Sequence, residues 1–193
     1  MRVFLAGASG VIGLRVLPLL VSQGHAVAAM TRSPEKAAQL LALGGEPVIC
    51  DVYELEALTT AVEAFAPEAV MHQLTDLPDR LDDLAEDAAK NDRMRSEGTS
   101  NLIAAAQNAS ACRFVAQSIA WRPSRGGEVV EQHEHQVLAI GGVVARYGQL
   151  YGPGTYYEGK LPPHPRIHVD AAARATPPLL DAPPGIETLV EPR

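Results

Sequence analysis

The stretch GASGVIG at residues 7–13 contains three glycines, one at every third position. It follows the short apolar run RVFLA (residues 2–6), which predicts a buried strand. It leads into residues 11–23, where apolar side chains recur with helical spacing. Glycines between a first strand and a first helix are the setting in which a turn binds the pyrophosphate of a dinucleotide. We therefore predict a dinucleotide-binding turn here rather than a purely structural one.

Each glycine has a separate physical task in this interpretation. Gly7 allows a tight turn off the strand, Gly10 lets the backbone approach a pyrophosphate, and Gly13 lets the helix pack closely on the strand. The amino end of the helix would present free N–H groups and its positive dipole end to the phosphates. The predicted phosphate-binding residues are Gly7, Ser9, Gly10, Val11, Ile12 and Gly13.

Strands and helices are predicted to alternate along the chain. Further apolar strands are expected at residues 25–30, 47–50, 69–74, 113–118 and 142–148, with helices at 34–43, 53–65, 81–108, 129–140 and 170–180. This alternation is typical of an α/β fold of Rossmann type, with a doubly wound, mostly parallel sheet and right-handed crossovers. Ligands of such sheets bind at the carboxyl ends of the strands, beside strand one.

The composition changes in the last quarter of the chain. Nine of the fifteen prolines lie at or after Pro153, which excludes long regular elements there. We expect residues 1–150 to form an NAD(P)-binding domain. Residues 151–193 are expected to form a short, irregular C-terminal cap on the substrate side, which is not an independent domain.

Charge and hydropathy restrict the classes of function. The formal net charge is −7, which argues against a nucleic-acid partner, and no apolar run approaches the roughly 20 residues of a membrane helix. The amino terminus lacks the pattern of a signal peptide, so a cytoplasmic protein without a membrane partner is expected. Cys50 and Cys112 are too few for a disulfide framework and are predicted to be buried free thiols.

The spacing G-x-x-G-x-x-G resembles that of the short-chain dehydrogenase/reductase superfamily, in its extended or atypical branch related to nucleotide-sugar epimerases and dehydratases. Further stretches are similar to that family in the same order along most of the chain. They are EGTSNLIAAA (residues 97–106), RFVAQSIAW (113–121), RYGQLYGPGT (146–155) and IHVDAAARAT (167–176). The resemblance implies a Rossmann fold, a nicotinamide cofactor and a small-molecule substrate, and it leaves a homodimer open.

The resemblance also implies cofactor contacts beyond the glycine turn. They are Thr31 and Arg32 after the second strand, Asp51 and Val52 beside the adenine, and His72, Gln73 and Leu74 along the ribose. The second strand is not followed by the acidic residue that would bind a ribose 2′-hydroxyl. A guanidinium at Arg32 can pair with a 2′-phosphate instead, which favours NADP, with NAD as the alternative.

The catalytic part of the family pattern is incomplete. Ser118 lies at the position of the family's catalytic serine, but residues 129–140 lack the tyrosine and the lysine four residues later. Tyr151 is the substitute that we predict for the missing acid or base. Arg95 stands where the family has an asparagine. Three explanations fit these departures: an atypical enzyme, a cofactor-binding regulator, or a sequence that lacks internal segments.

Other polar residues have simpler interpretations. His133 and His135 are two positions apart and would point to different faces of a helix, so no metal site is expected and His133-Glu134-His135 is interpreted as a solvated helix face. Arg146 is either structural or substrate-facing. The leading function is an NAD(P)-dependent oxidoreductase or epimerase/dehydratase acting on a hydroxyl or carbonyl group of a small molecule, with a nucleotide sugar as one candidate. The alternative is a non-catalytic NADP(H)-binding sensor or regulatory protein.

Overall fold

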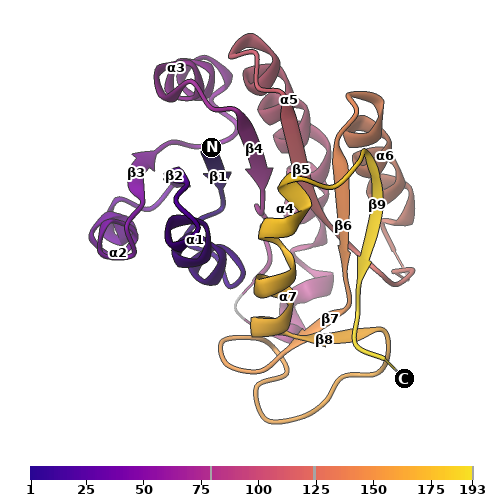
Figure 1. Cartoon of the computed structure of the whole chain (residues 1–193). Helices are drawn as coiled ribbons and strands as arrows, with labels where there is room; N and C mark the ends of the chain where they lie inside the picture. Colours follow the sequence, from indigo (N-terminus) through magenta and orange to yellow (C-terminus); the bar gives the residue numbers. More distant parts are fainter. Residues whose placement is uncertain (79, 124, 193) are drawn as a thin grey trace.

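A computed structural model describes residues 1–78, 80–123 and 125–192 of the chain. Its central feature is a seven-stranded sheet in the order β3-β2-β1-β4-β5-β6-β9, in which every neighbouring pair is parallel (Figure 1). The strands are β1 (Arg2–Ala6), β2 (Ala26–Thr31), β3 (Glu46–Ile49), β4 (Ala69–His72), β5 (Arg113–Ile119), β6 (Val143–Tyr147) and β9 (Gly185–Leu189). The predicted Rossmann-type fold is thereby confirmed.

Helices cover both faces of the sheet. The α-helices are α1 (Gly13–Ser22), α2 (Ala37–Ala42), α3 (Leu55–Phe65), α4 (Ala88–Arg93), α5 (Thr99–Asn108), α6 (Gly127–Ala139) and α7 (Val169–Ala175). Leu17 and Leu20 of α1 join Ala172 of α7 in one buried apolar cluster. Leu102 of α5 and Val137 of α6 belong to a second cluster on the opposite face. The two clusters explain why the short apolar strands are buried from both sides.

The strand order reverses direction at β1. From β1 (Arg2–Ala6) the chain first winds outward through β2 and β3, then returns to β4 on the other side of β1. Ala6, the last residue of β1, is in register with Met30 of β2 and with His72 of β4. The crevice at this switch point lies just beyond these three residues, and Gly7 is the first residue to enter it.

Two predicted helices are interrupted. The expected helix over 81–108 is a 3-10 turn η2 (Leu81–Ala85), α4, a π-helical segment η3 (Met94–Gly98) and α5, because the acidic residues before α4 bury no apolar face. The expected helix over 34–43 divides into a 3-10 turn η1 (Pro34–Lys36) and α2. The N–H of Ser33 donates to Thr31 Oγ1 (3.2 Å), and the Ser33 side chain makes no cap.

The C-terminal segment contains more regular structure than the sequence predicted. Strands β7 (Gln149–Tyr151) and β8 (Arg166–His168) pair in parallel, and α7 is followed by a 3-10 turn η4 (Pro177–Leu180). Strand β9 then pairs with β6 and completes the sheet. The sequence did not predict β9 because an edge strand with mostly exposed side chains lacks an apolar run. Arg193 lies outside the described residues.

Two smaller expectations from composition can now be compared with the structure. Cys50 is buried as predicted, but Cys112 is exposed, because it lies before β5 at the amino edge of the sheet rather than inside it. Within residues 1–78, 80–123 and 125–192, no helix combines the length and apolar character needed to cross a membrane.

Candidate functional site

The glycine turn is closed by contacts between backbone atoms. Gly7 has a φ of +87°, and a Cβ there would lie 2.7 Å from the carbonyl carbon and oxygen of Gln73. A Cβ on Gly13 would lie 2.1 Å from the Gly7 oxygen. These contacts confirm the tight turn and the close helix packing predicted for Gly7 and Gly13. At Gly10 a Cβ would meet only the Gly7 oxygen, at 3.4 Å, so its exposed side is open to a ligand.

The end of β2 is tied to the glycine turn. The hydroxyl groups of Ser9 and Thr31 lie 2.8 Å apart. Arg32 follows with an exposed side chain, and its Nη2 donates to Oδ1 of Asp76 at 3.0 Å. The hydrogen bond to Asp76 also raises the pKa of Arg32. The structure therefore groups Ser9, Thr31 and Arg32 beside the crevice, as the cofactor prediction requires.

The residues predicted to flank an adenine lie after β3. Asp51 Oδ1 accepts the N–H of Tyr53 at 3.0 Å, and the carbonyl of Val52 accepts a hydrogen bond from Asn101 Nδ2 at 3.1 Å. Val52 is buried and Asp51 is half-buried. The guanidinium of Arg93 stacks on the Tyr53 ring at 3.8 Å from its centroid. This end of the crevice thus has a fixed backbone and an aromatic wall.

The end of β4 is linked to two helices by a buried chain of hydrogen bonds. The N–H of Leu74 lies 3.2 Å from Nδ1 of His72, and Nε2 of His72 lies 3.1 Å from Thr99 Oγ1. Thr99 Oγ1 lies 2.8 Å from Nδ1 of His133, whose Nε2 lies 2.9 Å from the carbonyl oxygen of Gln117. His72, Thr99 and His133 are each at most 1% exposed. The chain joins β4, α5, α6 and β5.

The two ends of this chain fix the position of every proton in it. The Leu74 N–H can only donate, so His72 Nδ1 accepts and Nε2 carries the proton. The Gln117 carbonyl can only accept, so His133 Nε2 carries the proton and Nδ1 accepts from Thr99. Both imidazoles are therefore neutral. Burial is the main cause that lowers the pKa of both rings, and it lowers that of His72 well below its ordinary value.

A second polar cluster lies at the end of β5. Ser118 Oγ donates to Oε1 of Glu134 at 2.6 Å, and Nε of Arg146 donates to the same oxygen at 2.8 Å while its Nη2 bonds Oε2. Ser118 is 1% and Glu134 is 5% exposed. Burial acts to raise the pKa of Glu134, but the bonds from Arg146 and Ser118 outweigh it, and the pKa of Glu134 is lowered. Glu134 is thus a buried carboxylate.

The prediction of a solvated face for His133-Glu134-His135 is wrong for two of the three residues. His133 and Glu134 are buried and only His135 is exposed. The sequence could have indicated this, because His133 and Val137 are one helical turn apart and Val137 is in the core. Arg146, left open above, is a partner of Glu134 with its side chain 38% exposed. The predicted absence of a metal site stays a prediction.

The predicted substitute acid, Tyr151, has different partners from Ser118. Tyr151 lies on β7, and its hydroxyl donates to Oε2 of Glu191 at 2.7 Å. That bond raises the pKa of Tyr151. The more deeply placed Tyr147 bonds Gln73 Nε2 and Thr176 Oγ1, and burial raises its pKa to about 12. A catalytic role for Tyr151 therefore stays a prediction.

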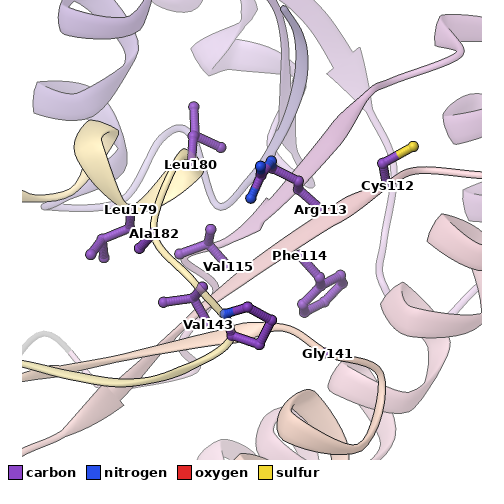
Figure 2. Close-up of a pocket in the computed structure, with 10 residues that line it drawn as sticks. Cys112, Arg113, Phe114, Val115, Gly141, Val143, Leu179, Leu180 and Ala182 are labelled. Carbon is purple, nitrogen blue, oxygen red and sulfur yellow. The ribbon is translucent and has the colours of Figure 1, made fainter.

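A cavity of about 240 Å³ lies away from these groups (Figure 2). It is lined by Arg113 and Val143, the first residues of β5 and β6, and by Leu179 and Leu180 of η4. These positions are at the amino ends of the strands, whereas Gly7 and Ser118 are at the carboxyl ends. The cavity is therefore separate from the crevice in which a cofactor is expected.

The parallel sheet, its switch point and the glycine turn define a dinucleotide-binding protein of the short-chain dehydrogenase/reductase superfamily, extended branch. Residues 7–138, more than half of the chain, match the model of the family described as NAD(P)H-binding. The chain belongs to that family. Its fold and its glycine turn are those that such a cofactor requires.

Two curated proteins show what the chain is similar to. The 3-diazoavenalumate denitrifying reductase of a Streptomyces species is 38% identical over 182 residues, which covers 81% of this chain and 59% of that protein. The 4-hydroxy-2-methyl-3-oxo-4-farnesyl-3,4-dihydroquinoline-1-oxide ketoreductase of Stigmatella aurantiaca is 31% identical over 115 residues, covering 60% of this chain and 32% of that protein. The chain thus spans less than two thirds of either relative.

Solved structures show the same fold. The UDP-glucose 4-epimerase of Thermus thermophilus, in complex with NAD, aligns with a TM-score of 0.81 over 100% of this chain and 78% of that one, at 19% identity. The UDP-glucose 4-epimerase of Thermotoga maritima, with UDP-glucose, aligns with a TM-score of 0.82 over the same shares, at 15% identity. These likenesses establish the architecture of the chain.

The backbone contact at Gly13 can be tested by a single methyl group. Gly13→Ala is expected to open the turn, because the new Cβ would lie 2.1 Å from the Gly7 oxygen, and to weaken NADPH binding at least tenfold. Fluorescence titration of the purified variant with NADPH measures this. The control is Gly127→Ala, since a Cβ there meets no atom within 4 Å. Equal affinity of Gly13→Ala and wild type would contradict the assignment.

The buried histidines predict a loss of stability in acid. Because their pKa values are lowered in the folded state, the unfolded chain binds more protons below about pH 6.5, and the free energy of unfolding falls as the pH drops. One such proton accounts for at most about 1.4 kcal/mol per pH unit. Urea unfolding between pH 7 and pH 5 should show a smaller slope in His133→Gln. The exposed His135→Gln is the control, and an equal slope in both variants would exclude the neutral pair.

Proposed function

We propose that this protein is an NADP-dependent oxidoreductase that acts on a hydroxyl or carbonyl group of a small molecule. The observation that carries the proposal is the glycine turn at the switch point, closed by the Gly7, Gly13 and Gln73 backbone and open at Gly10. A nicotinamide cofactor bound there supplies or accepts the hydride. The reductase names of both curated relatives support a redox reaction.

Residues of this chain would bind the cofactor along the crevice. The turn from Gly7 to Gly13, with Ser9, Val11 and Ile12, would bind the pyrophosphate through its N–H groups. Thr31 and Arg32 would bind the adenosine ribose, with Asp51 and Val52 beside the adenine. The segment His72-Gln73-Leu74 would border the second ribose, held in place by the buried hydrogen-bond chain.

Ser118 is the residue that we assign to the substrate oxygen. Its proton is donated to Glu134, so the remaining lone pairs of its Oγ can accept a hydrogen bond from a substrate hydroxyl. A substrate proton taken up by Ser118 could pass on to the Glu134 carboxylate, which Arg146 holds in place. Tyr151 is retained as a second candidate for proton transfer. The helix that would carry the family's tyrosine and lysine provides Glu134 instead.

A cofactor-binding sensor is the second candidate. It is favoured by the burial of Ser118 and Glu134, which are 1% and 5% exposed, and by the missing tyrosine and lysine. The sensor and the enzyme share the same cofactor turn. They differ in whether bound NADPH is consumed.

Turnover separates the two functions. NADPH oxidation, followed by absorbance, is measured against a panel of ketones, aldehydes and UDP-sugars. We expect turnover of at least one carbonyl compound, and Ser118→Ala should lower kcat about 100-fold without changing NADPH affinity, because only a substrate contact is lost. Ser100→Ala, an exposed position on α5, is the control. NADPH binding without turnover of any compound would instead establish the sensor.

The choice of cofactor has its own test. Arg32→Ala is expected to weaken NADPH binding roughly tenfold and to leave NADH binding unchanged, because only NADPH carries the 2′-phosphate. Fluorescence titration with both coenzymes measures the two affinities. Arg80→Ala removes an exposed arginine that pairs with Asp82 and Asp83, and it serves as the control. Equal NADPH affinity in Arg32→Ala and wild type would exclude the assignment of NADP through this residue.

A further inference from the structure

Arg32 already has an anionic partner in the structure. Its Nη2 donates to Oδ1 of Asp76 at 3.0 Å. Asp76 lies in the loop that follows β4, so it reaches Arg32 from across the mouth of the crevice. Asp51 is a second carboxylate that acts on the same guanidinium electrostatically. The positive charge on which a preference for NADP depends is therefore balanced before any cofactor binds.

Asp76 is the fixed member of this ion pair. Its N–H donates to Oδ1 of Asn91 at 3.1 Å, and Asn91 is buried on α4. The side chain of Asp76 is 18% exposed, whereas that of Arg32 is 57% exposed. The carboxylate is thus held by the loop and α4, and the longer arginine side chain reaches toward it.

The ion pair leaves the guanidinium open to a second anion. Asp76 takes one nitrogen of Arg32, and among the described residues Nε and Nη1 of Arg32 accept no other partner. A phosphate bound to those nitrogens would lie a few ångströms from the Asp76 carboxylate, where like charges repel each other. A ribose hydroxyl carries no charge and meets no such repulsion.

We infer that Asp76 is a specificity-determining residue, which lowers the affinity for the 2′-phosphate of NADP and leaves the affinity for NAD unchanged. The chain then discriminates between the two coenzymes less strongly than an unpaired Arg32 would. This inference rests on the proposed role of Arg32. It concerns how large the preference is, whereas the Arg32→Ala variant decides whether the preference exists.

The test removes the charge of Asp76 and keeps its shape. Asp76→Asn is expected to bind NADPH about fivefold more tightly and NADH within twofold of wild type, in fluorescence titrations at low ionic strength. Competition by 2′,5′-ADP should strengthen by the same factor, and competition by 5′-AMP should not change. The gain should shrink at 0.5 M salt, because salt screens the exposed pair. Asp82→Asn removes an equal charge from the neighbouring η2 and is the matched control.

A positioning role for Asp76 would give the opposite result. If Asp76 only orients Arg32, Asp76→Ala weakens NADPH binding, whereas our inference requires Asp76→Ala to strengthen it as Asp76→Asn does. An unchanged ratio of NADPH to NADH affinity in folded Asp76→Asn would also overturn the inference. Failure of the proposed function is distinguishable, because wild type would then bind neither coenzyme, or Arg32→Ala would bind NADPH as wild type does.

Discussion

The approach of the Gly13 backbone to the Gly7 carbonyl is the constraint on which the crevice depends. There is no room for a single methyl group between them, and Gly7 in turn touches the backbone of Gln73 at the exit of β4. The first turn of α1 is thereby placed against the ends of two neighbouring strands. Every other group assigned to the cofactor is positioned relative to that three-way contact, and only backbone atoms make it.

The side chains around the crevice are arranged to satisfy groups that have been removed from water. His72, Thr99 and His133 form one directional chain between a backbone donor and a backbone acceptor, so no proton in it is left without a partner. Ser118 and Glu134 form a second closed set with Arg146. The first set holds β4 and β5 in relation to α5 and α6, and the second provides an ionised carboxylate beside a hydroxyl.

The sequence predicted those features that depend on local pattern. Apolar runs predicted the six inner and edge strands through β6, and the glycine spacing predicted the turn, since both signals lie within a few residues. The buried ion pair of Glu134 and Arg146 was missed because a charged residue beside two histidines resembles a solvated face. The pairing of Arg32 with Asp76 joins residues far apart in sequence, and composition and periodicity carry no information about such pairs.

The edge strand β9 has a consequence for the order of folding. Gly185 pairs with Val143, about forty residues earlier, so the chain must close a long loop before the last two strands meet. Its neighbours in the sheet can form first, and the pairing with β6 is the last to add stability. The mostly exposed side chains of β9 contribute little apolar burial to offset that closure. This edge is therefore where amide hydrogens of the sheet should exchange with solvent earliest, while β1 and β4 remain protected.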